Sequence, residues 1–189
     1  MYNDDPNMDL ETRFQQELKR KAMMERIVKN VNYDEVYQII ESLKPEEKNF
    51  LYPDTFGEFR EPQFLVARQL YYVLPNDIPP EDIPNIPEEI IRQIRLPVGF
   101  ADATLMNPLN TLVAYLFVAI SPQFRKKYVS PILIKGIVKD LQAKGFKKLI
   151  LLADSISPCF NEILKMANRN KFVRERNTPD GKVLFSRRL

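Results

Sequence analysis

The chain has 189 residues, of which 44% are apolar, so it can bury one hydrophobic core and is expected to form one domain with an appendage. It contains no histidine and one cysteine, Cys159, which excludes an internal disulfide, the usual zinc sites and a nucleophile paired with histidine. The first thirty residues are charged throughout and no apolar run reaches about eighteen residues. We therefore expect no metal site, no membrane span and no secretory signal, and a cytoplasmic protein, or a virion component if the source is viral.

The net charge of +3 hides a strong asymmetry along the chain. Residues 31–121 hold 14 acidic and 6 basic residues, whereas residues 122–189 hold 5 acidic and 16 basic residues. Two interpretations stay open: the acidic middle and the basic end attract one another, or the basic end faces a polyanion such as a phosphorylated cofactor or nucleic acid. Nucleic acid is the less favoured polyanion, because the chain shows no recognised reading motif and no aromatic stacking platform.

The amino-terminal part is expected to be helical. Apolar residues between positions 9 and 29 fall roughly on one side of a helix, although Arg26–Val31 also fits a first strand. We treat residues 1–25 as a charged appendage that docks on the chain's own core or binds a protein partner. Asn32 is placed to cap a short helix with Val36, Ile39, Ile40 and Leu43 on one face, and Pro45–Glu47 begins another helical turn.

The next segments alternate between extended and proline-rich sequence. Residues 64–74 are apolar and fit either a strand or a helix. Residues 75–87 hold five of the fifteen prolines and predict a long surface loop. Residues 88–95 then fit a short helix with Ile90, Ile91 and Ile94 on its apolar side, residues 97–106 fit a strand, and residues 107–110 fit a turn.

Residues 111–153 predict a βαβ unit around which the chain is organised. Two apolar runs, residues 112–120 and 148–153, flank a helix whose apolar positions recur at three- and four-residue steps: Leu133, Ile134, Ile137, Val138 and Leu141. Ser130 and Pro131 suit the start of this helix, and Gly145 suits the left-handed residue just past its end. The connection between the first run and the helix is basic, with Arg125, Lys126 and Lys127 in succession.

The carboxyl-terminal part predicts a second helix and a hairpin. Ser157 and Pro158 are placed to cap a helix whose apolar positions are Phe160, Ile163, Leu164 and Ala167. Residues 171–176 and 182–187 read as short strands joined by the turn-forming residues 177–181.

This order of elements resembles the GCN5-related N-acetyltransferase (GNAT) superfamily over roughly residues 26–189. The most specific parts are residues 97–100 as the family's third strand and residues 116–125 as its fourth strand running into the cofactor turn. The resemblance implies an α/β (α+β) fold with a central mixed, mostly antiparallel twisted sheet flanked by helices, here with an extra amino-terminal helix and a proline-rich insertion at residues 75–95.

The resemblance also implies an acetyl-coenzyme A site. In the family, backbone amides of the turn wrap the pyrophosphate at a helix start, and the fourth strand pairs with the pantetheine arm. The implied contacts here are Val118, Ile120, Arg125, Lys126, Lys127, Tyr128, Val129, Ser130 and Asn161. The sequence departs from the family's turn, because Tyr128 and Ser130 stand at its two small-residue positions, and glycine would allow a closer approach of backbone to phosphate.

The catalytic residues are less well marked than the cofactor turn. The family's tyrosine acid, five residues before the phenylalanine that matches Phe172, corresponds to Ala167. The run 112–120 has no carboxylate, which leaves Asp102 as the candidate general base and Tyr115 as a candidate acid that also fits a core position. Cys159 lies beside a helix start, which favours the thiolate, but without histidine we expect it to fill a small apolar space.

Two functions remain in view from the sequence. The first is a divergent acetyl-coenzyme A dependent N-acetyltransferase acting on an unknown acceptor amine. The second is an inactive GNAT-fold protein that binds a partner in a larger assembly such as a phage particle, consistent with the missing glycines and tyrosine.

Overall fold

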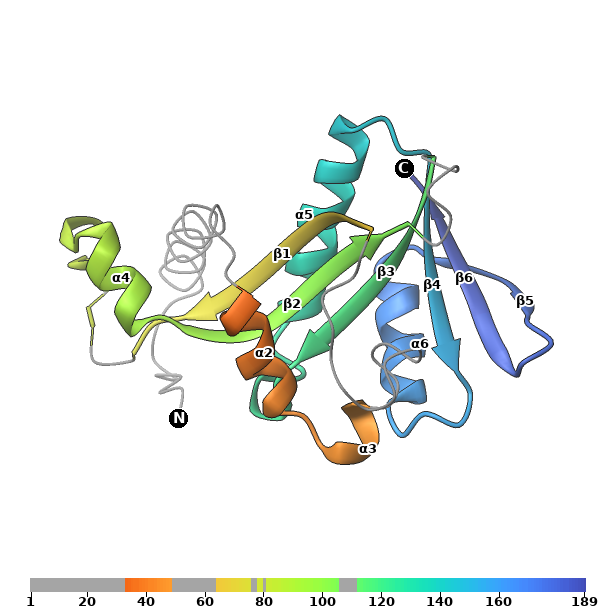
Figure 1. The fold of residues 1–189 in the computed structure, drawn as a ribbon, viewed down its shortest axis with the longest axis horizontal. Coiled ribbons are helices and arrows are strands. Elements are labelled where there is room, and N and C mark those ends of the chain that lie inside the picture. Colours follow the sequence, from red (N-terminus) through yellow and green to blue (C-terminus); the bar gives the residue numbers. More distant parts are fainter. Residues whose placement is uncertain (1–32, 49–63, 76–77, 80, 106–111) are drawn as a thin grey trace, which may run out of the picture. The chain divides into compact units, whose positions relative to one another are not determined.

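The computed structural model describes residues 33–48, 64–75, 78–79, 81–105 and 112–189 (Figure 1). The expected helix at residues 9–29, the cap at Asn32 and the turn at residues 107–110 lie outside these residues. The described residues fall into two compact units, one made by Tyr72–Leu96 and the other by residues 33–71 and Pro97–Leu189.

The helices and strands alternate along the chain, as the sequence indicates for most of its length. In order they are α2 (Tyr33–Glu41), α3 (Pro45–Lys48), β1 (Leu65–Val73), the 3₁₀ turn η2 (Ile83–Asn85), α4 (Glu88–Ile94), β2 (Leu96–Thr104), β3 (Val113–Ile120), the 3₁₀ turn η3 (Pro122–Phe124), α5 (Val129–Ala143), β4 (Lys148–Asp154), α6 (Phe160–Arg169), β5 (Val173–Asn177) and β6 (Lys182–Arg188).

Within the described residues the strands form one mixed sheet in the order β1-β2-β3-β4-β6-β5. The β3–β4 pair is parallel, and the pairs β2–β3, β4–β6 and β5–β6 are antiparallel, which confirms the mixed, mostly antiparallel sheet. Helices α5 and α6 cover one face and α2 lies on the other (Figure 1). The ambiguous segment 64–74 is a strand, because β1 pairs into this sheet edge.

The smaller unit contains the predicted loop and short helix. Helix α4 forms at the expected residues; none of its residues is buried, Ile91 and Ile94 are half-buried and Ile90 is exposed. Ile83 is buried, and the guanidinium of Arg95 lies 4.0 Å from the ring centroid of Tyr72. This ring contact joins the start and the end of the unit.

The βαβ unit is confirmed, with a correction at the start of its helix. The five predicted apolar positions of α5 are all buried, and Gly145 adopts a left-handed φ of 80° just past the helix end. The helix begins at Val129, however, so Ser130 and Pro131 lie inside its first turn and no side chain caps it. The reason is local: Tyr128 turns the backbone with a left-handed φ of 58°, and Val129 is buried directly after it.

Helix α6 also starts differently from the prediction. Its first residue is Phe160, and no side chain caps it. The Ser157 hydroxyl instead accepts the Cys159 amide at 3.2 Å in the turn before the helix. The predicted hairpin is confirmed as β5 and β6, with Gly181 at a left-handed φ of 82° in the connecting turn.

Gly99 of β2 allows the start of α5 to pack closely on the sheet. A β-carbon at this position would lie 3.1 Å from Cγ1 of Val129 and 3.2 Å from the carbonyl oxygen of Ala119. We expect Gly99→Ala to lower the free energy of unfolding by about 1–3 kcal/mol, the usual cost of overpacking. Urea denaturation measures the effect, and an unchanged free energy of unfolding would contradict the close packing at Gly99.

Candidate functional site

The parallel strands β3 and β4 pair only at their beginnings. Their register covers Val113 with Lys148, Ala114 with Leu149 and Tyr115 with Ile150, although β3 continues to Ile120 and β4 to Asp154. Beyond these three pairs the strands separate, as Figure 1 shows. Among the described residues, the second half of β3 therefore has a strand partner on the β2 side only.

The hydrogen-bond pattern shows which peptide groups face this separation. The Ser121 amide donates to the Val98 carbonyl at 2.9 Å, so by antiparallel alternation Ala119 bonds to β2 and Val118 points its N–H and C=O away from β2. Leu112 lies an even number of residues before Val118, so its peptide groups point to the same side. Its carbonyl accepts the amides of Lys147 and Lys148 at the start of β4. No strand among the described residues pairs with Val118 on that side. This leaves a donor and an acceptor suited to an amide-containing ligand.

The turn between β3 and α5 has an unusual backbone. Lys126 and Tyr128 both adopt left-handed conformations, with φ of 65° and 58°, which non-glycine residues adopt only at a cost of about 1 kcal/mol or more each. Such alternation of right- and left-handed residues makes backbone N–H groups converge on one point. Among the described residues, no backbone acceptor bonds the amides of Lys126, Tyr128, Val129 and Ser130.

The surroundings of the turn favour an anion. The side chains of Lys126 and Lys127 are exposed, and the Lys127 ammonium lies 4.9 Å from the ring centroid of Phe124. The uncapped start of α5 adds the partial positive charge of its dipole. The Tyr128 side chain is 71% exposed, so its ring points into solvent and does not fill the turn.

Arg125, also predicted as a cofactor contact, is bonded within the protein. Its Nη1 and Nη2 atoms donate to the two carboxylate oxygens of Glu47 at 2.6 and 2.8 Å, and its Nε donates to the Ile120 carbonyl at 3.2 Å. The Ile120 carbonyl is thereby occupied as well. Sequence reasoning missed Glu47, since 78 residues separate it from Arg125 and nothing in the local pattern links them.

The Glu47 carboxylate is held in its charged form. The hydrogen bonds from Arg125 lower the pKa of Glu47 from 4.5 to about 2, and the Cys159 thiol donates a further bond at 3.2 Å. Burial, together with the neighbouring Glu47 carboxylate, raises the pKa of Cys159 to about 11. Cys159 is therefore a half-buried thiol that donates a hydrogen bond, and not the purely apolar side chain expected from the sequence.

This pair predicts a pH dependence of stability. A carboxylate whose pKa is lower in the folded chain stabilises it above the unfolded value of 4.5 and loses that contribution as the pH falls toward about 2. We expect urea denaturation between pH 6 and pH 3 to show wild-type stability falling toward that of Glu47→Gln. Parallel curves for the two proteins over this range would contradict the prediction.

The catalytic candidates lie on β2 and β3, away from α5. Asp102 is completely buried, and its two oxygens accept Nε and Nη2 of Arg68 at 2.7 Å each. Both oxygens of this candidate base are therefore engaged by a side chain of the neighbouring strand, and its role as a base stays a prediction. Tyr115 is half-buried at the last β3–β4 pair, and its role as an acid stays a prediction.

The chain is similar in structure to a crystal structure of the GNAT domain of S. lividans PAT. The TM-score is 0.61 at 12% sequence identity, and the match covers 86% of this chain and 89% of that one. The chain has the GNAT fold. A second match, to a GNAT superfamily phosphinothricin acetyltransferase from Sinorhizobium meliloti in complex with AcCoA, has a TM-score of 0.44 and 17% identity over 50% of this chain and 55% of that one. No family model matches the sequence, and no curated protein matches it.

Within this GNAT fold, the predicted cofactor contacts come together at one end of β3. Val118, Ile120 and residues 125–130 follow each other along β3, the turn and α5, and Asn161 is exposed at the start of α6. Cys159, two residues before Asn161, contacts the same Glu47 carboxylate as Arg125, which places the start of α6 near the turn. Ala167 is buried in the core, so the position of the family's tyrosine acid carries no hydroxyl.

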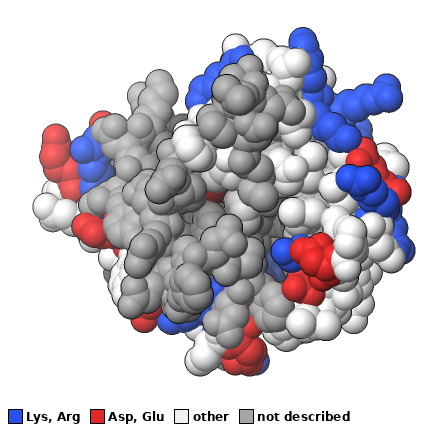
Figure 2. Space-filling view, turned by 45° about the vertical axis from the view of Figure 1, so that its right-hand side comes forward, with Lys and Arg blue, Asp and Glu red and all other residues white. Residues whose placement is uncertain are grey.

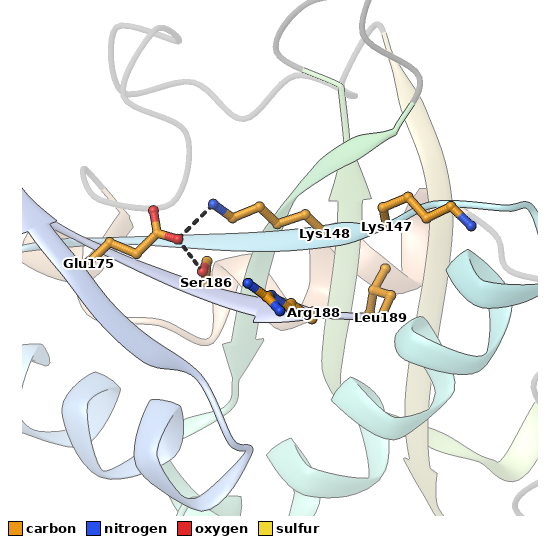
Figure 3. Close-up of a pocket in the computed structure, with 6 residues that line it drawn as sticks. All are labelled: Lys147, Lys148, Glu175, Ser186, Arg188 and Leu189. Carbon is orange, nitrogen blue, oxygen red and sulfur yellow. Dashed lines mark hydrogen bonds and ion pairs between the residues drawn. The ribbon is translucent and has the colours of Figure 1, made fainter.

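A separate hollow of about 450 Å³ lies at the other end of the sheet, where β4 begins. Figure 3 shows Glu175 directed at Lys148 and Ser186, which donate to it at 2.6 and 2.5 Å, while Lys147 points away. These contacts lower the pKa of Glu175. Since Lys148 pairs with the first residue of β3, this hollow is remote from the turn and is not part of the GNAT site.

Three further observations concern the described part of the chain as a whole. In the space-filling view, Lys and Arg side chains gather toward the upper right (Figure 2). Among the residues that the structure describes, no helix is long and apolar enough to cross a membrane. The same residues contain no group of three or more histidine, cysteine, aspartate or glutamate side chains placed to hold a metal ion.

Proposed function

We propose that the chain binds acetyl-coenzyme A at the β3–α5 turn and is an acetyltransferase-like protein. The observation that carries this proposal is the continuous path from the unpaired peptide of Val118 to the left-handed turn and the uncapped start of α5. An extended amide-containing arm next to a diphosphate matches such a path, because β-type pairing and converging amides are suited to these two groups.

The residues present fit this cofactor in four respects. Amides of Lys126, Tyr128, Val129 and Ser130 would hold the diphosphate, and Lys126 and Lys127 would add charge. The exposed ring of Tyr128 leaves the turn open, and the Val118 peptide would align the arm. Acetyl-coenzyme A supplies an activated acetyl group as a thioester.

The chain's own contribution to transfer would be positioning. Holding an acceptor amine beside the end of β3 would lower the entropic part of the activation barrier, because the amine and the thioester would no longer have to meet in solution. The amine proton would pass to water, because both oxygens of Asp102 are bonded to Arg68. With Ala167 in place of the tyrosine acid, Tyr115 stays the candidate to protonate the leaving thiolate.

Calorimetric titration with coenzyme A tests the proposal. Binding should stabilise the native state by about 2.7 kcal/mol when the ligand is at 100 times its Kd, and thermal denaturation detects that shift. Lys126→Ala/Lys127→Ala should weaken binding roughly tenfold and flatten its salt dependence. Lys135→Ala/Lys139→Ala, which changes the same charge on the exposed side of α5, is the matched control. The absence of heat and thermal shift at millimolar coenzyme A would remove the proposal.

A binding protein without transfer activity is the second candidate. It is favoured by the Asp102–Arg68 pair, which engages the candidate base, and by Ala167, which stands where the resemblance implies a tyrosine acid. Release of free thiol from acetyl-coenzyme A in the presence of a panel of primary amines separates the two functions. Binding without thiol release above the solution rate would favour the inactive protein, with residues 1–25 as the segment proposed to bind its partner.

A further inference from the structure

Glu47 is contacted from three separate parts of the chain. Its carboxylate accepts both terminal nitrogens of Arg125 at 2.6 and 2.8 Å, the Cys159 thiol at 3.2 Å and the Lys44 amide at 3.2 Å. Only 9% of the Glu47 side chain is exposed. We call Glu47, Arg125 and Cys159 the Glu47 brace.

The partners in the brace sit at the ends of the two strands that separate. Arg125 follows β3 after the turn η3, and Cys159 follows β4 just before α6. Glu47 therefore joins the outgoing ends of β3 and β4 across the place where their own pairing has stopped. Ser42, at the end of α2, adds a second tie from the same segment by donating to the Ser121 hydroxyl at 2.8 Å.

All three nitrogens of the Arg125 guanidinium group are engaged in the brace. Two face Glu47 and the third bonds the Ile120 carbonyl, so the planar group is fixed against the end of β3. Its charge is matched by the Glu47 carboxylate. The exposed positive side chains at the turn are then those of Lys126 and Lys127.

We propose that Glu47 is a positioning residue for the coenzyme site: through Arg125 and Cys159 it fixes the turn and the separation of β3 from β4, and Arg125 shapes the turn without contacting phosphate. This inference rests on the proposed function. The proposed role of Glu47 and simple electrostatics predict opposite effects on coenzyme affinity. Removing the Glu47 charge makes the turn more positive, which by Coulomb attraction alone would tighten an anion, whereas loss of the brace weakens binding.

Titration of coenzyme A into four variants tests the proposal. Glu47→Gln keeps the side-chain shape, and we expect roughly tenfold weaker binding. Arg125→Ala should weaken binding by a similar factor, and Glu47→Gln/Arg125→Ala should be no weaker than either single variant, because each removes the same unit. Glu46→Gln, an exposed carboxylate on the same short helix, removes the same charge and should leave affinity unchanged or slightly increased.

Two further measurements separate positioning from a general loss of structure. Glu47→Asp keeps the charge with a shorter reach and should recover part of the affinity. The alkylation rate of Cys159, the single thiol of the chain, should rise in Glu47→Gln because its hydrogen-bond acceptor loses its charge. If Glu47→Gln does not fold, Arg125→Lys, which retains the charge without the two-pronged contact, should weaken binding in its place.

The outcomes distinguish this inference from the proposed function. If the wild-type chain binds no coenzyme A, the proposed function fails, and the role of the brace in coenzyme binding fails with it. The brace itself is tested separately: an unchanged alkylation rate of Cys159 in Glu47→Gln would contradict the contact between Glu47 and Cys159. If the wild-type chain binds and Glu47→Gln binds equally or more tightly, the inference is overturned and the coenzyme site stands. Additive losses from Glu47→Gln and Arg125→Ala would likewise assign Arg125 to the phosphate and overturn it.

Discussion

Arg68→Ala should lower the free energy of unfolding by about 3–5 kcal/mol, the usual cost of leaving one partner of a buried ion pair uncompensated. The Asp102 side chain is fully buried and that of Arg68 is 7% exposed, with both contacts at 2.7 Å. Removing the guanidinium leaves a fully buried carboxylate without its arginine. Urea denaturation at neutral pH measures the effect.

Two variants control this prediction. Arg92→Ala breaks the exposed pair with Glu88 on α4, whose side chains are 44% and 70% exposed, and should cost no more than about 0.5 kcal/mol. Arg68→Leu/Asp102→Leu removes both charges and should recover most of the stability lost in Arg68→Ala. If this double variant also keeps any transfer activity, Asp102 is not the general base. A loss in Arg68→Ala no larger than in Arg92→Ala would contradict the structural importance of the pair.

Proline substitutions at adjacent positions of β3 should have very different effects. Ala119 faces β2 opposite Phe100, so Ala119→Pro removes a ladder hydrogen bond and places its ring against a neighbouring strand, at a cost of about 3 kcal/mol. Val118 points its amide toward the separation from β4, where no described strand accepts it. Val118→Pro should therefore cost much less stability and instead weaken coenzyme A binding, by roughly tenfold for one lost hydrogen bond.

Melting temperature and calorimetric affinity, measured on the same samples, test this contrast. Val118→Ala is the control for the change in side-chain size, since it keeps the amide. Equal destabilisation by the two prolines would show that β3 is paired on both sides. A stable Val118→Pro variant with wild-type affinity would exclude Val118 as a ligand contact.

Local patterns in the sequence predicted most of the described elements. The spacing of the apolar residues of α5 and the glycine at residue 145 predict a helix between two strands from the local sequence alone. The start of α5 was mispredicted because Ser130 and Pro131 form a good cap by local rules, whereas the left-handed Tyr128 and the close packing of Val129 on Gly99 begin the helix earlier. Packing overrode the local preference there.

The site could be predicted only in outline. The position of the basic turn could be predicted, because residues 125–130 are contiguous in the sequence. The pairing of Arg68 with Asp102 and of Glu47 with Arg125 could not, since 34 and 78 residues separate the partners and each carboxylate is also compatible with solvent or a ligand. Only the three-dimensional structure shows which partner each carboxylate has, and both carboxylates bind arginines of the chain itself.

The left-handed backbone at Tyr128 has a consequence for how such a chain diverges. A residue with a side chain pays about 1 kcal/mol or more for this conformation, and the restriction that it places on the unfolded chain offsets only part of that cost. The turn therefore holds its backbone path at some expense of stability, which the burial of Val129 directly after it opposes. A chain can thus keep the GNAT fold, at 12% sequence identity to a solved structure, with a tyrosine in place of a glycine at such a turn.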